Sequence, residues 1–172
     1  MKPRLFVLLF IAVLLLALGT IAAACGDDDE LTLEEYFQRV EGLSDEADER
    51  FEPLVEALDQ EFESEADQVE ATRAFFNADI PILRDFVDAL DDLDPPTEVE
   101  DPHDEAVAGG AEMVEFLADF TDRFADVEST SELEELLDAP ELEAASDRFD
   151  KACFALQDIA DANGIVVDLE CE

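Results

Sequence analysis

The chain contains a single histidine, His103, and this limits the chemistry that its side chains can perform. Covalent hydrolases place a nucleophile beside a base, and neither a Gly-x-Ser-x-Gly motif nor a second histidine supports one here. Di-iron bundles carry Glu-x-x-His on two helices, whereas only 100–103 matches, with Pro102 inside the match. The motifs for covalent haem and for zinc peptidases are also absent. We therefore expect no catalytic residue, no metal site and no cofactor. His103 is expected to be half-exposed in a first helical turn beside acidic residues, with a metal-binding or catalytic role as the alternative.

Acidic side chains gather in two clusters, at 27–30 and at 91–94, and further acidic residues follow the second cluster up to Asp101. Carboxylate oxygens bind hard cations, but neither cluster has the glycine and glutamate spacing of an EF-hand calcium loop. We expect a polar tether and a solvated loop, with weak cation association over the whole surface. A dedicated cation site is the alternative.

The first 24 residues have the layout of a secretory signal peptide. Lys2 and Arg4 form a short basic head, 5–18 is an apolar run, and a short stretch of mostly small residues precedes Cys25. The stretch Ile-Ala-Ala-Ala-Cys at 21–25 resembles the lipobox of bacterial and archaeal lipoproteins. That resemblance implies cleavage before Cys25 and lipidation of its thiol. The alternative is an uncleaved membrane span.

This interpretation gives the chain three parts: a signal peptide at 1–24, an acidic tether at 25–31 and a single domain at 32–172. The lipid on Cys25 would anchor the domain to the outer face of the cytoplasmic membrane or to the cell envelope. The partners expected there are the membrane itself and an envelope protein.

The two remaining cysteines, Cys153 and Cys171, are expected to form a disulfide. Lipidation of Cys25 leaves an even pair, and the compartment outside the cytoplasm permits oxidation. The predicted last helix rises from Cys153 to Ala162, and Gly164 then reverses the chain so that the tail reaches back to Cys153. We interpret the bridge as structural, because catalytic thiol pairs are usually Cys-x-x-Cys. Two buried free thiols are the alternative.

The 49 acidic residues against nine Lys and Arg give a formal net charge of -40. This charge excludes binding to nucleic acid and electrostatic docking to anionic lipid. A hydrophobic content of 48% with 13 Phe argues against a disordered chain. The charge indicates either an ordinary solvated exterior or a saline habitat, where ions screen the repulsion. Crowded carboxylates are expected to have raised pKa values.

Apolar residues recur at helical spacing through most of the chain, and no useful strand alternation precedes residue 165. We predict an all-α fold: an antiparallel four-helix bundle with a short extra helix from Ser131 to about Asp138 and an extended C-terminal tail. Pro53 and Pro81 predict kinks in the first two helices. The pair Gly109–Gly110 predicts either a close helix approach or a local weakness. The remaining helix boundaries are predicted at Thr32, Ser64, Asp94, Asp101, Pro140 and Asn163.

Three functions remain for this chain, and the sequence does not name its partner or ligand. The first is a non-catalytic interaction or envelope-accessory role, which predicts an exposed apolar patch. The alternative is a binding protein for a small apolar ligand or for metal cations; for the apolar ligand it predicts a Phe-lined pocket. An enzyme, which we do not expect, predicts a cleft where His103, arginines and buried carboxylates converge.

Overall fold

The computed structural model describes residues 31–124, 127–132, 139–169 and 171. These residues contain no β-strand, which confirms the all-α prediction. They form four long helices: α2 (Leu33–Leu58), α3 (Glu65–Asp91), α4 (Glu100–Phe124) and α6 (Pro140–Ala162). Cys25 and the predicted signal peptide lie outside the described residues. Residues 133–138 of the predicted short helix also lie outside them, whereas its first two residues, 131 and 132, are described and helical, as is residue 130 before them.

The starts of the first two helices agree with the local sequence signals. Thr32 caps α2 through a capping box with Glu35, and Ser64 caps α3 by accepting from the Asp67 amide. The third helix was predicted to start after an N-cap at Asp101, but α4 already begins at Glu100 and includes Asp101. α2 and α3 continue through exposed Pro53 and Pro81 without interruption, and a kink at either proline stays a prediction.

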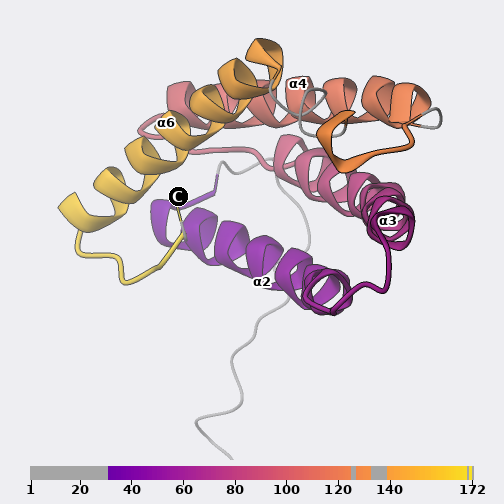
Figure 1. Ribbon diagram of the computed structural model, residues 1–172. Helices are drawn as coiled ribbons and strands as arrows, with labels where there is room; N and C mark the ends of the chain where they lie inside the picture. Colours follow the sequence, from indigo (N-terminus) through magenta and orange to yellow (C-terminus); the bar gives the residue numbers. More distant parts are fainter. Residues whose placement is uncertain (1–30, 125–126, 133–138, 170, 172) are drawn as a thin grey trace, which may run out of the picture.

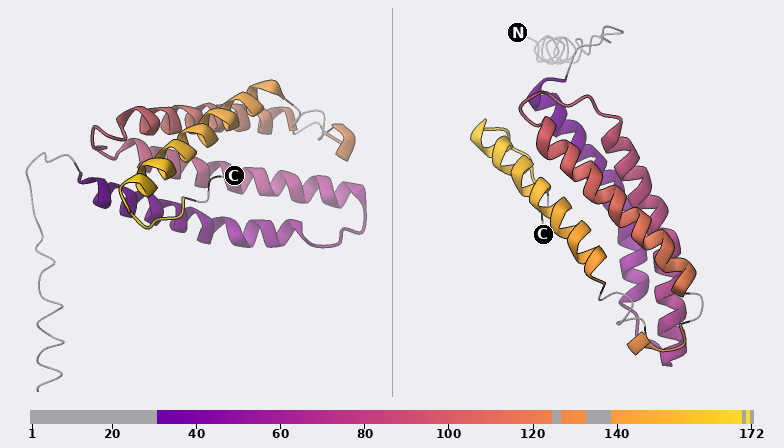
Figure 2. Two further views of the ribbon diagram at one scale, coloured as in Figure 1. Left: turned by 90° about the vertical axis from the view of Figure 1, so that its left-hand side faces the viewer. Right: turned by 90° about the horizontal axis from the view of Figure 1, so that it is seen from above.

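The helices pack in chain order. α2 packs on α3, α3 on α4, and α4 on α6, whereas α2 and α6 do not form an interface of comparable extent. Figures 1 and 2 show α4 and α6 grouped on one side of the molecule and α2 and α3 grouped on the other. The side between α2 and α6, which a closed four-helix bundle would pack, is therefore left partly open.

The contact between α4 and α6 depends on glycine. A Cβ on Gly109 would lie 2.8 Å from the backbone nitrogen of Phe149 and 3.2 Å from the Ala145 carbonyl oxygen. Because both atoms belong to the backbone of α6, only glycine allows the two helices to approach this closely. The neighbouring Gly110 lies against the side chain of Val87 on α3. The close approach predicted for this pair is confirmed.

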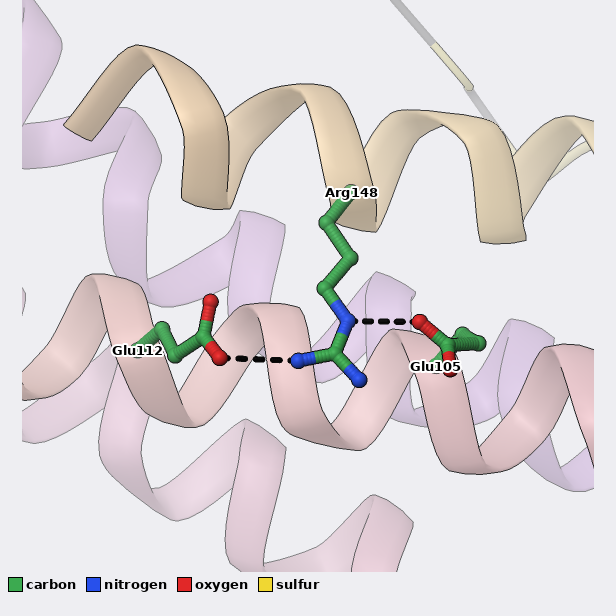
Figure 3. A network of polar contacts seen from close by, with 3 residues as sticks. All are labelled: Glu105, Glu112 and Arg148. Atoms are coloured by element: carbon green, nitrogen blue, oxygen red, sulfur yellow. Dashed lines mark hydrogen bonds and ion pairs between the residues drawn. The ribbon is translucent and has the colours of Figure 1, made fainter. Parts of the chain in front are cut away.

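Arg148 adds an ionic contact between the same two helices (Figure 3). Its guanidinium group donates from Nε to Glu105 at 2.6 Å and from Nη1 to Glu112 at 2.8 Å. The two carboxylates lie two helical turns apart on α4, so one planar guanidinium group binds both of them. The hydrogen bond between Arg148 and Glu105 lowers the pKa of the Glu105 carboxyl group and raises the pKa of the Arg148 guanidinium group.

Two apolar clusters form the interior. The larger one joins the start of α2 to the second half of α6 and includes Tyr36, Phe37, Leu90, Val99 and Leu156. The smaller one joins α3 to the end of α4 through Val69, Phe120 and Phe124, with Val127 beyond.

In the described part of the chain no helix combines the length and the apolar character needed to cross a bilayer.

Candidate functional site

A partly open groove of about 700 Å³ occupies the space between α2 and α6. α2 contributes one helical face to it, which consists of Val40, Ser44, Ala47, Asp48 and Phe51. α6 contributes a second face, which consists of Phe149, Asp150, Cys153 and Leu156. Leu83, Phe86 and Leu90 of α3, together with Ala106 of α4, complete the floor. The volume falls in the range of small-molecule binding sites in proteins.

The walls of the groove are mostly apolar and aromatic. Phe86 and Phe149 meet edge to face with their ring centroids 6.5 Å apart, so they join α3 to α6 across the floor. Phe51 lines the α2 side, and all three phenylalanines are only partly buried. These rings remain accessible at the groove because the contact between α2 and α6 is not extensive enough to cover them.

The C-terminal tail forms the remaining wall. In the structure Cys153 and Cys171 form a disulfide with their Cα atoms 5.7 Å apart, as the sequence predicts. The Gln157 side chain also binds the tail, donating to the Val167 carbonyl and accepting from the Leu169 amide, each at 3.1 Å. Gly164, at φ 69°, allows the reversal that brings the tail back along α6. Figure 1 shows the tail turning back from the end of α6 toward α2.

The tail residues alternate as expected. Leu169 is buried, and Ile165 and Val167 are partly buried, whereas Val166 is 99% exposed. Asp168, Leu169 and Cys171 all line the groove. The disulfide therefore builds one wall of the candidate site as well as fixing the end of the chain.

The charged residues that the structure places in the lining are Asp48 on α2, Asp150 on α6 and Asp168 on the tail. Within the described part of the chain, no Lys, Arg or His lines the groove. The basic side chains nearby bind other acids: Arg50 pairs with Asp85, and Lys151 pairs with Asp147. Arg148, described above, holds two carboxylates of α4. None of these ion pairs involves Asp48 or Asp150.

His103 lies in the first turn of α4, as the sequence predicts, but it is not half-exposed. It is buried, with 3% of its surface exposed, and its Nδ1 lies 3.1 Å from the hydroxyl of Tyr36. Burial lowers the pKa of His103, although the nearby Asp104 and Asp91 oppose this, and burial raises the pKa of Tyr36. The pair joins the start of α4 to the start of α2 and does not line the groove. The prediction that His103 is half-exposed was wrong because it ignored this partner from a distant part of the chain.

The carboxyl group with the most clearly raised pKa owes that rise to burial and not to crowding by other acids. The pKa of Asp79 is raised to about 6 because its side chain is desolvated within the fold. By contrast, hydrogen bonds lower the pKa values of Glu35, Glu65 and Glu105. A general rise across the acidic surface is therefore the wrong expectation for these groups.

The acidic cluster at 91–94 does not assemble a metal site with its neighbours. Among the residues with described positions, no group of three or more His, Cys, Asp or Glu side chains is arranged to hold a metal ion. The cluster at 27–30 and the predicted lipidation site Cys25 lie outside those residues.

The sequence predicts a Phe-lined pocket for an apolar ligand but does not indicate its position between α2 and α6.

Comparisons with protein-family models, curated proteins and solved structures find no match to this chain.

Proposed function

We propose that this chain is a lipid-anchored protein outside the cytoplasm that binds a small, largely apolar ligand in the groove between α2 and α6. The groove carries the proposal, because a volume of about 700 Å³ with phenylalanines in its walls is suited to such a ligand. This favours the ligand-binding alternative over a general interaction role. The exposed large apolar side chains, Val55, Phe154 and Val166, come from three separate elements of the described chain.

The role that we propose is binding without catalysis. Among the described residues, the groove lining contains no histidine to transfer protons and no lysine or arginine to stabilise a developing negative charge. The fold that we propose for this role is an antiparallel four-helix bundle opened on one side. The chain-order packing of the helices supports that topology.

The anchor rests on the resemblance of 21–25 to a lipobox. We propose that Cys25 becomes the lipidated first residue of the mature protein, at the outer face of the cytoplasmic membrane or in the envelope. The intact mass of protein extracted from membranes tests this part. A mass that retains residues 1–24 without added lipid would contradict it, and Cys25→Ser is expected to block processing.

The groove is tested with the full chain in phosphatidylcholine vesicles and the neutral fluorophore N-phenyl-1-naphthylamine. We expect a saturable fluorescence increase above that of protein-free vesicles. Ala47→Phe places a ring in the groove and should abolish the increase, because Ala47 is a lining residue. The matched control is Ala57→Phe, at an exposed position of α2 outside the lining, and it should bind normally. Equal fluorescence from Ala47→Phe and the unmodified chain would refute the proposal.

A further inference from the structure

We infer that the ligand of the groove is an organic cation, with an amine or quaternary ammonium group attached to an apolar body. This inference rests on the proposed function, because it names the chemical class of ligand for the same groove. The evidence for it is the charge and the aromatic character of the lining, taken together.

The first observation is the negative charge of Asp48 and Asp150, which lie on the two helices that border the groove. Among the described residues, no basic side chain lines the groove, and none of the ion pairs above involves either carboxylate. The cations that neighbour them along the chain are bound elsewhere, since Arg50 pairs with Asp85 and Lys151 pairs with Asp147. An anionic ligand would be repelled here, and a neutral ligand would leave both carboxylates without a charged partner.

The second observation is that aromatic rings accompany these carboxylates. Phe51 lies one turn from Asp48 on α2, and Phe149 directly precedes Asp150 on α6. The face of an aromatic ring attracts an ammonium group, and the attraction strengthens when the cation is partly removed from water. Carboxylates and phenyl rings in one lining therefore favour an organic cation. A hydrated metal ion would gain little from apolar walls.

The test measures displacement of N-phenyl-1-naphthylamine from the full chain in phosphatidylcholine vesicles, near pH 7. The competitors are 4-phenylbutylamine, 4-phenylbutan-1-ol and 4-phenylbutyrate, which share one apolar body and differ in charge. We expect the amine to displace the fluorophore at a concentration on the order of tenfold lower than the alcohol, and the carboxylate to be the weakest. An amine no better than the alcohol would overturn the inference.

The whole surface of this chain is acidic, so the experiment must separate the groove from the surroundings. Asp48→Asn combined with Asp150→Asn should reduce the advantage of the amine and leave displacement by the alcohol unchanged. The control combines Asp45→Asn with Asp158→Asn, which removes the same charge from exposed positions of the same two helices outside the lining. If the control reduces the advantage equally, long-range surface charge causes it and the inference is wrong.

The failure of this inference is distinct from the failure of the proposed function. If the neutral fluorophore does not bind to the groove at all, the proposed function fails and the inference fails with it. If the fluorophore binds and Ala47→Phe blocks it, the groove is a binding site. Competition by the three phenylbutyl compounds then decides the charge of its ligand.

Discussion

Replacing Gly109 by alanine should destabilise the fold, although alanine is the better helix former. In an exposed helix interior this substitution stabilises by about 1 kcal/mol, because glycine loses more backbone entropy on folding. At Gly109 the added methyl would lie 2.8 Å from the Phe149 nitrogen and 3.1 Å from the Phe149 Cα, whereas ordinary contacts lie at 3.4–4 Å. α6 must therefore move away by at least about 0.6 Å, because backbone atoms cannot rotate aside as a side chain does.

The size of the effect follows from two opposing contributions. Inserting a methyl group into a closely packed contact costs about 1–3 kcal/mol, and the upper end applies where a whole helix must shift. Subtracting the gain in helix propensity leaves a net destabilisation of about 1–2 kcal/mol. For a domain of this size each kcal/mol lowers the melting temperature by about 2–4 °C.

The matched control is Gly42→Ala on α2. Gly42 is exposed, and nothing lies within 4 Å of a Cβ added there, so this variant should be stabilised by about 0.5–1 kcal/mol. Urea denaturation in a common buffer measures both free energies of unfolding. The reasoning is refuted if Gly109→Ala gains stability as Gly42→Ala does, because the helices would then not be in contact at that position.

The remaining predictions concern a buried acid, the disulfide and the surface charge. Because burial raises the pKa of Asp79 to about 6, folding is disfavoured as the pH rises through that value; Asp79→Asn should stabilise at pH 8 by up to about 3 kcal/mol. That gain should fade as the pH falls toward 3.8, and urea denaturation measures it, with exposed Asp88→Asn as the control. A gain that does not change with pH would contradict the raised pKa of Asp79. Cys171→Ser opens a loop with a sequence separation of 18 and should cost about 3 kcal/mol of unfolding free energy in the chain-entropy model. The same variant should weaken fluorophore binding, and unchanged binding would show that the tail is not part of the wall. Finally, a melting temperature measured in roughly 1 M NaCl should exceed that in about 0.05 M, because salt screens the repulsion among 49 acids; equal values would show that the repulsion is negligible.

The features that were predictable from the sequence are those that depend on neighbouring residues. The Thr32 and Ser64 caps, the reversal at Gly164 and the reach of Cys171 back to Cys153 involve short separations along the chain. Local propensity and the reach of the chain indicate such features without knowledge of the tertiary packing. The Gly109–Gly110 pair was informative for a similar reason, because two glycines inside a helix need a packing partner to compensate their cost.

The features that escaped prediction depend on contacts between distant segments. His103 is buried because Tyr36, 67 residues earlier in the chain, lies against it. Its immediate neighbours are mostly acidic and suggested exposure instead. The position of the groove could not be predicted for a related reason. Phe51, Phe86 and Phe149 lie on apolar helix faces, and the sequence does not show whether another helix covers such a face. That distinction follows from α6 packing along α4 and contacting α2 much less extensively.

The tail wall makes the candidate site depend on when and where the chain is oxidised. Thiols stay reduced in the cytoplasm, so a chain that has not yet been exported would lack the bond between Cys153 and Cys171. Its tail would then be held by the Gln157 hydrogen bonds and the apolar packing of Leu169, without the covalent bond that fixes Cys171 in the wall. In the proposed location, the groove is therefore completed only after export. A chain in transit would leave the cytoplasm without cargo and acquire its ligand from the surroundings of the membrane.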